Sequence, residues 1–265
     1  MSELGNLVHR AQDPEGEIHV YEDARFRYLT FGNQVEQSCL DLGDPEQLVH
    51  VHTQAMMLSC LLHPQPDEVL LAGLGGGSLA RAMRRARPGA TIYGLEQRAA
   101  VIEVAREWFG LPADRRFHIV QAEAGAYLEK VAASFDLILS DLYLAEGMDP
   151  CQTTLAYLQL AHDRLQPDGI LVVNQWASEH TGNREGPRHL ATVFGDRVLH
   201  LHVQGGNIIS FAFRGELPHL QRNAFFEQAL RLGLRLQIPL ARHARNLWRQ
   251  SAETLGVGRF RSRQW

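Results

Sequence analysis

Three acidic residues each stand at the end of an apolar, strand-like run of the sequence. They are Glu96 in "IYGLEQR", Glu123 in "HIVQAEAGAYL" and Asp141 in "FDLILSDLYLAEG". A carboxylate at the end of the second strand after a glycine loop can accept both hydroxyls of a ribose, and another carboxylate can orient an ammonium and take its proton. Each of the three could instead cap the helix that follows it. Together, in one crevice, they favour a nucleoside site with acid–base chemistry beside it.

Four clustered glycines, Gly73, Gly75, Gly76 and Gly77 in "VLLAGLGGGSLARAM", join a strand-like run to a helix-like run. A dinucleotide fingerprint has glycines at its first, third and sixth positions, but the sixth position counted from Gly73 is Ser78. The Gly-Lys-Ser or Gly-Lys-Thr of a phosphate loop is also absent. The loop therefore predicts close approach of a ligand to the backbone, and a phosphate loses support.

Alternating strand-like and helix-like segments must position these residues. The strands are expected at 69–73, 91–95, 117–121, 135–140 and 169–174, and the helices at 78–87, 98–108, 124–132 and 153–165. This alternation predicts an α/β fold with a Rossmann-like, mostly parallel sheet covered by helices on both faces. Two runs joined by "QGG" at 197–213 predict a terminal antiparallel hairpin, followed by a closing helix at 217–234.

The beginning of the chain has a different pattern. "EIHVYED" and "RFRYLTFG" are short strand-like runs, and the helix-like run "VHVHTQAMMLSCLLH" ends before Pro64 and Pro66. We therefore expect a small N-terminal β-rich domain at 1–50 and a Rossmann-like nucleoside-binding catalytic domain at 51–265.

The composition, with 45% hydrophobic and 21% charged residues, is that of a soluble globular protein. A formal net charge of −4 gives no sign of a nucleic-acid or membrane surface, and no apolar run approaches a membrane span of about 20 residues. The three cysteines match neither a disulfide framework nor a zinc spacing, so we expect a cytoplasmic protein. The pairs His50/His52 and His200/His202 lack a recognisable third ligand, so no metal centre is expected.

Residues 69–176 and the β-rich lead-in resemble the polyamine aminopropyltransferases, the spermidine synthase family. The resemblance rests on "VLLAGLGGGSLARAM", "GLEQRAAVIEVAREWFGLP", "AEAGAYL", "FDLILSD" and "LQPDGILVVNQW". It implies the Rossmann-like fold of S-adenosylmethionine methyltransferases, with decarboxylated S-adenosylmethionine as donor and a polyamine as small-molecule acceptor. It also implies a homo-oligomer, usually a dimer or tetramer.

The resemblance also implies roles for individual residues. Glu96 would hold the ribose, Glu123 would lie near the adenine, Asp141 would be the catalytic carboxylate, and Gln37 would approach the nucleoside from the β-rich domain. The residues expected to bind the nucleoside are Gln37, Gly73, Gly75, Gly76, Gly77, Glu96, Gln97, Glu123 and Ala124.

The sequence departs from the family pattern at acidic positions. The family's loop Gly-Gly-Gly-Asp-Gly-Gly reads "GLGGGS", which we interpret as Gly75 at the aspartate position. The family's Asp-Ser-Ser-Asp reads "DLYL", which keeps Asp141 and replaces the second aspartate with Leu144. The Tyr-His-Glu of the first helix has no clear counterpart. Glu146 and Asp149 are equally consistent with substitute carboxylates and with an ordinary solvated loop.

Three hypotheses remain open. The retained catalytic carboxylate and the β-rich lead-in favour an aminopropyltransferase. Glycine in place of the loop aspartate favours a methyltransferase that uses ordinary S-adenosylmethionine. The missing acidic groups are also consistent with a protein that binds a nucleoside without turnover.

Overall fold

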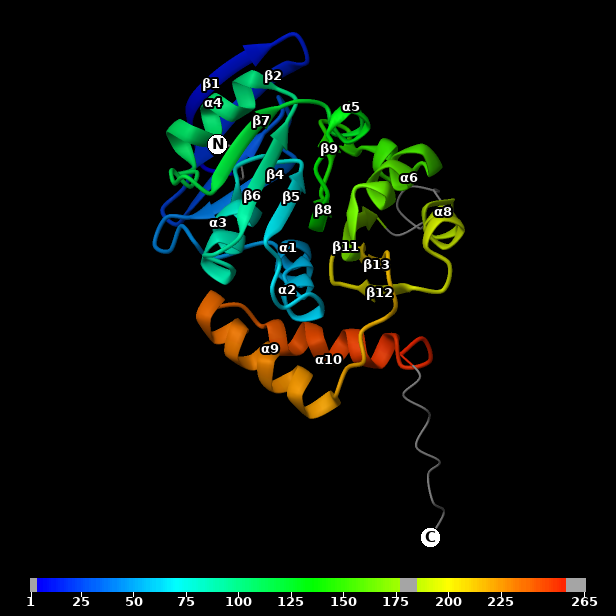
Figure 1. The fold of residues 1–265 in the computed structure, drawn as a ribbon. Coiled ribbons are helices and arrows are strands. Elements are labelled where there is room, and N and C mark those ends of the chain that lie inside the picture. The colour runs from blue at the N-terminus through cyan, green and yellow to red at the C-terminus, as the bar shows by residue number, and fades with distance from the viewer. Residues whose placement is uncertain (1–3, 177–184, 256–265) are drawn as a thin grey trace.

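Two β-sheets form the framework of the protein in the computed structural model, which describes residues 4–176 and 185–255 (Figure 1). The first sheet is antiparallel, with four strands in the order β1-β2-β3-β4. These strands are β1 (Asn6–Asp13), β2 (Gly16–Glu22), β3 (Phe26–Thr30) and β4 (Glu36–Asp41). The domain boundary near residue 50 stays a prediction.

The second sheet has seven strands in the order β12-β13-β11-β8-β5-β6-β7. Its parallel strands are β5 (Glu68–Ala72), β6 (Thr91–Glu96), β7 (Phe117–Gln121), β8 (Phe135–Ser140) and β11 (Leu165–Trp176). The hairpin of β12 (Val198–His202) and β13 (Asn207–Phe213) completes the sheet, with β13 antiparallel to β11. The predicted fold class is confirmed.

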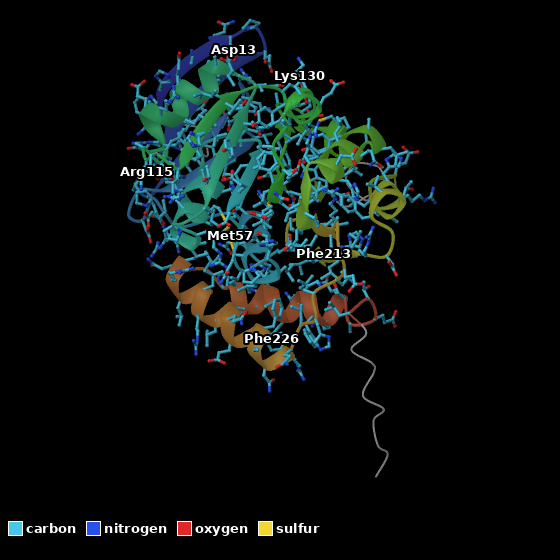
Figure 2. The ribbon with its side chains drawn as sticks, in the orientation of Figure 1. Asp13, Met57, Arg115, Lys130, Phe213 and Phe226 are labelled. Carbon is cyan, nitrogen blue, oxygen red and sulfur yellow. The ribbon has the colours of Figure 1, made fainter. Side chains whose placement is uncertain are left out.

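Helices cover both faces of this sheet because successive strand side chains point to opposite sides. In β5, Val69 and Leu71 enter one core, whereas Leu70 and Ala72 enter the other. The first core is covered by α1 (Val51–Met56), α2 (Ser59–Leu62), α3 (Ser78–Ala86), α9 (Arg222–Leu236) and α10 (Leu240–Gln250). The second is covered by α5 (Ala124–Lys130), α6 (Leu155–Asp163) and α8 (Glu185–Phe194). Met57 and Phe213, labelled in Figure 2, are buried in the first core, above the α9–α10 pair in that view.

The helical segments differ in detail from the sequence-based expectation. The helix expected before Pro64 is divided into α1 and α2, and neither α8 nor α10 was predicted. The closing helix, α9, ends where Gln237 adopts a left-handed backbone with φ +56°, and Pro239 then precedes α10. None of the described helices combines the length and apolar character that crossing a membrane requires.

The antiparallel sheet packs on α4 (Ala99–Trp108), the helix after β6. One shared core contains Ile18, Val20, Leu29 and Leu40 from the sheet, and Val101, Val104 and Phe109 from α4 and its end. The buried Arg98 guanidinium adds two bonds to the Asp13 carboxylate, at 2.8 and 2.9 Å. This packing brings β4 beside the glycine loop, where Gly76 N donates to Ser38 Oγ at 2.9 Å.

Candidate functional site

A cavity of about 490 Å³ lies where β3 and β4 meet the carboxyl ends of β5, β6, β7 and β8. Parallel α/β sheets bind ligands at this end of their strands. Of the residues predicted from sequence, Gln37, Gly73, Gly75, Glu96, Gln97, Glu123, Ala124 and Asp141 line the cavity. Gly76 and Gly77 do not belong to the lining. The cavity is open, so its predicted lining residues are available to a ligand.

The glycine loop is shaped by the protein itself. A Cβ at Gly73, where φ is +92°, would lie 2.3 Å from the carbonyl oxygen of Asp141. At Gly77, where φ is +74°, a Cβ would lie 2.0 Å from Leu111 Cδ2. Both positions require glycine because a left-handed backbone and a close neighbour exclude a side chain. Glycine is therefore needed in this loop for the protein's own packing, and not only for the approach of a ligand.

Glu96 and Glu123 are positioned by local backbone groups. The two oxygens of Glu96 accept from Gly75 N at 3.3 Å and from Arg98 N at 3.1 Å. Burial raises the pKa of Glu96, and these two hydrogen bonds oppose that shift. Glu123 caps α5 by accepting from the backbone N–H groups of Gly125 and Ala126. The capping alternative is therefore real for Glu123, although its carboxylate also lines the cavity. We call Gly73, Gly75, Glu96 and Glu123 the glycine-loop side.

A buried amide network holds Asp141. Asn174 Nδ2 donates to Asp141 Oδ1 at 2.8 Å, and Asn207 Nδ2 donates to Asn174 Oδ1 at 2.9 Å. The same two amide nitrogens also donate to the hydroxyl oxygen of Tyr143, at 3.1 and 3.2 Å. Burial raises the pKa of Tyr143, so this phenol stays protonated at neutral pH. Asp141 is thus oriented as a hydrogen-bond acceptor at the cavity.

Two histidines from the start of α1 complete this part of the lining. The rings of His50 and His52 stack with their centroids 5.1 Å apart, and His50 Nε2 pairs with the Glu36 carboxylate. Burial lowers the pKa of His52, with the nearby Asp141 carboxylate acting in the opposite direction. His52 is therefore neutral at pH 7. We call Glu36, His50, His52, Asp141 and Tyr143 the histidine side.

Sequence reasoning did not identify the histidine side beyond Asp141. Glu36 immediately precedes the predicted Gln37, and the His50/His52 pair was considered as a metal ligand set and was given no role in binding the nucleoside or the amine. Tyr143 lies in the "DLYL" stretch that departs from the family pattern. The sequence could have suggested these residues because some of them stand next to predicted ones. That their side chains lie together at the cavity depends on how β4 and α1 pack.

The cavity lining is acidic. Five carboxylates line it, from Glu36, Glu96, Glu123, Asp141 and Asp149. Within residues 4–176 and 185–255, no lysine or arginine contributes to the lining. Asp149 also accepts from Cys151 N at 2.8 Å, and Glu146 is exposed outside the lining. An excess of carboxylates over cationic groups favours a positively charged ligand.

Comparison with known proteins places this arrangement in a family. A family model described as "Methyltransferase domain" matches residues 66–194. A polyamine aminopropyltransferase of Chromobacterium violaceum is 31% identical over 251 residues, covering 94% of this chain and 96% of that protein. The chain belongs to the polyamine aminopropyltransferase family.

The chain is also similar to a solved structure and to part of a larger methyltransferase homolog. The crystal structure of a probable spermidine synthase from Corynebacterium glutamicum matches with a TM-score of 0.71 and 20% identity, covering 85% of this chain and 87% of that chain. An eEF1A lysine and N-terminal methyltransferase homolog of Drosophila pseudoobscura is 28% identical over 205 residues. That similarity covers 72% of this chain and 30% of the larger protein.

Counting the glycine loop corrects one of our predictions about this family member. In Gly-Gly-Gly-Asp-Gly-Gly the aspartate is fourth, and the fourth residue counted from Gly73 is Gly76 rather than Gly75. A Cβ at Gly76 would lie 2.9 Å from atoms of both Phe109 and Ser38. Glycine thus replaces the aspartate where this chain packs its loop against β4. The other replaced position, Leu144, lines the cavity with an apolar side chain.

Proposed function

We propose that this protein transfers the aminopropyl group of decarboxylated S-adenosylmethionine to a small amine. The observation that carries the proposal is the acidic cavity, with no lysine or arginine from the described residues in its lining. The decarboxylated donor and a protonated amine are both cationic and match this charge. Ordinary S-adenosylmethionine has an additional carboxylate, which would lose solvation in the cavity without gaining a cationic partner there.

In this proposal the glycine-loop side binds the nucleoside. Glu96 accepts the ribose hydroxyls, because its carboxylate lines the cavity and is already oriented by Gly75 and Arg98. Glu123 lies near the adenine, and each of its oxygens keeps a lone pair beyond its bond to α5. Gln37 and Gln97 line the same cavity and supply further polar contacts.

The histidine side acts on the amine. An aliphatic ammonium has a pKa near 10, like that of lysine, and must lose a proton before its nitrogen attacks. Asp141, held by Asn174, attracts and aims the ammonium. The amine nitrogen bonds to the carbon beside the sulfonium, the carbon–sulfur bond breaks, and its electron pair returns to sulfur as methylthioadenosine leaves. Asp141 and neutral His52 are the proton acceptors beside this reaction.

Methyl transfer from ordinary S-adenosylmethionine is the second candidate. Gly76 and Leu144 stand where the family has aspartates, which removes two attractions for the aminopropyl ammonium. Charge-assisted hydrogen bonds contribute about 1.5–3 kcal/mol each, so their loss lowers affinity for the decarboxylated donor substantially. The relative named as a lysine and N-terminal methyltransferase homolog also supports this alternative.

Calorimetric titration with three nucleosides tests the proposal. S-adenosylmethionine, its decarboxylated form and methylthioadenosine are titrated separately, and methylthioadenosine release is then assayed with putrescine and a panel of other amines. We expect tighter binding of the decarboxylated donor and amine-dependent release. Preference for the carboxylated donor would support methyl transfer instead, and tight binding without turnover on any amine would support a non-catalytic protein.

A further inference from the structure

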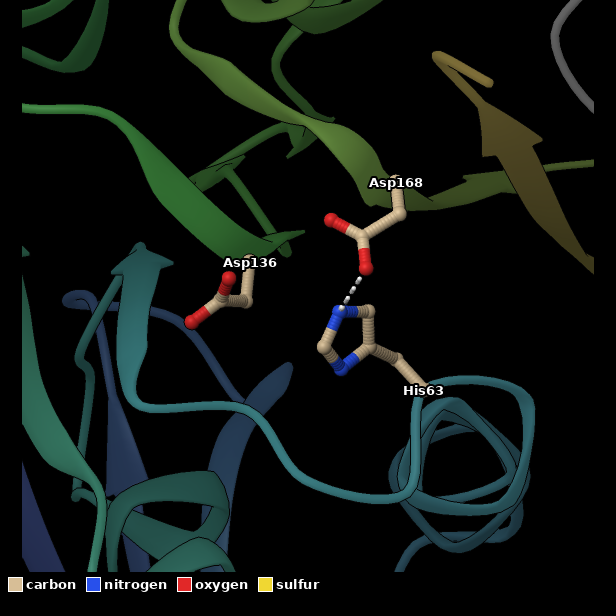
Figure 3. Close-up of side chains that lie close together, drawn as sticks. All are labelled: His63, Asp136 and Asp168. Atoms are coloured by element: carbon tan, nitrogen blue, oxygen red, sulfur yellow. Dashed lines mark ion pairs between the residues drawn. The ribbon is translucent and has the colours of Figure 1, made fainter. Parts of the chain in front are cut away.

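A second cluster of ligating side chains lies at the opposite end of the sheet from the cavity. It consists of His63 at the end of α2, Asp136 near the start of β8, and Asp168 near the start of β11, where the pairing of β11 with β8 shifts register (Figure 3). One ligand atom from each residue lies within 4.8 Å of the others. Asp136 and Asp141 stand at opposite ends of β8, roughly 16 Å apart at about 3.3 Å per residue. The cluster is therefore separate from the proposed active site.

His63 lacks the hydrogen bonds that a buried imidazole requires. Its side chain is 12% exposed, and both ring nitrogens are shielded from solvent without a hydrogen-bond partner. Nε2 lies 3.6 Å from Asp168 Oδ2, which is an ion-pair distance and longer than a hydrogen bond. Buried polar groups are normally satisfied, so this orphaned ring indicates a ligand between it and the carboxylates.

The two carboxylates differ in how they are held by the protein. Asp136 Oδ2 accepts from the backbone N–H groups of Asp67 and Glu68, at 2.7 and 2.9 Å, which fixes the carboxylate and leaves Oδ1 available. The Asp168 side chain is 81% exposed and can move toward the ring. Among the described residues, neither carboxylate forms an ion pair with lysine or arginine.

We propose that His63, Asp136 and Asp168 bind a divalent transition-metal ion such as Zn²⁺. One imidazole nitrogen and two carboxylate oxygens suit zinc, whereas Ca²⁺ and Mg²⁺ prefer sites made of oxygen alone. Zinc bonds of about 2.0–2.2 Å need the three ligand atoms closer together than the 4.8 Å within which they now lie, so zinc binding requires these side chains to draw together, and the exposed Asp168 is free to do so. The exposed side of Asp168 leaves room for water as a further ligand. The ion would tie the end of α2 to β8 and β11.

The test is zinc binding by the full chain after treatment with a chelator. We expect one Zn²⁺ per chain by calorimetry, and a thermal midpoint that rises by roughly 5–10 °C at a zinc concentration about 100 times the Kd. Asp168→Asn alters an exposed side chain, so it should fold normally and weaken zinc binding by at least about tenfold. His63→Gln should have the same or a larger effect.

The matched control is His162→Gln, which alters another histidine–aspartate pair, at 3.1 Å from Asp163. It should bind zinc like the unaltered chain. Undiminished zinc binding by Asp168→Asn, or an equal loss in His162→Gln, would overturn the proposal. A third result would also overturn it: Asp168→Asn lowers the thermal midpoint by the same amount in zinc and in chelator. That result would mean that Asp168 stabilises the fold only through its ion pair with His63. Neither readout depends on the proposed transferase activity.

Discussion

The two sides of the cavity are built in different ways. On the glycine-loop side, Glu96 and Glu123 are oriented by backbone N–H groups within three residues of themselves or in the adjacent loop. On the histidine side, Glu36 pairs with His50, and Asp141 depends on Asn174. The first side belongs to consecutive strand–helix junctions, whereas the second is assembled by side-chain contacts among β4, α1, β8 and β11.

Because the two sides are built differently, we expect substitutions on them to change different properties of the protein. Backbone-held carboxylates on consecutive junctions are suited to grip the part of a ligand that does not react. Side chains that orient one another are suited to the reacting groups, because their protonation depends on their neighbours. Substitutions on the glycine-loop side should therefore change nucleoside affinity, and those on the histidine side should change turnover or amine affinity.

The largest effect is expected from Asp141→Asn. The amide keeps the shape of the side chain but cannot accept a proton, so turnover should fall by about 10²–10⁴-fold. Methylthioadenosine release measures turnover, and calorimetry should show a nucleoside Kd within about threefold of the unaltered protein. If the Kd rose as much as turnover fell, Asp141 would instead belong to the nucleoside-binding side.

Glu96→Ala should produce the largest loss of nucleoside affinity. Losing hydrogen bonds to a charged acceptor costs about 1.5–3 kcal/mol, which corresponds to a Kd for methylthioadenosine raised by about 10–150-fold. The control is Glu103→Ala, which removes an exposed glutamate of α4 outside the cavity. Unchanged affinity in Glu96→Ala would contradict our placement of the ribose.

Glu36→Gln should affect the amine and leave the nucleoside alone. The substitution removes the attraction between the Glu36 carboxylate and a bound ammonium. Because Glu36 and His50 are partly exposed, this attraction is worth about 1 kcal/mol, so the KM for a diamine should rise about fivefold. Steady-state kinetics measure this change, and Glu17→Gln is the control because Glu17 pairs with His19 outside the cavity, at 3.2 Å. A matching rise in the Kd of methylthioadenosine would remove the proposed distinction between the two sides.

The smallest effect concerns pH. Burial holds the pKa of His52 below its ordinary value of 6.5, so the ring becomes charged only at lower pH than a free histidine. A charged His52 would weaken the attraction of Asp141 for an ammonium. Activity should therefore persist through pH 6.5 and decline as pH falls further. His52→Gln should remove part of this decline in kcat/KM between pH 5 and 8, and an identical profile would exclude His52.

Much of the fold and one side of the cavity, the glycine-loop side, were predictable for a physical reason. The four residues of the glycine-loop side follow apolar strands closely, and parallel strands bring their carboxyl ends to one edge. Gly76 and Gly77 were predicted as ligand contacts, but they are packed against Ser38, Phe109 and Leu111. A glycine required by packing and a glycine required by a ligand have the same sequence signature.

The sequence by itself determined the alternation of strands and helices from β5 to β11, the fold class, and the acidic residues at successive strand ends, because hydrophobic periodicity and local turn chemistry act over short distances along the chain. Tertiary structure alone decided that β4 and α1 bring Glu36, His50 and His52 to Asp141. It also decided that His63, Asp136 and Asp168 meet at the other end of the sheet. Such contacts depend on packing between segments that are far apart in the sequence, so the spacing of residues along the chain does not predict them.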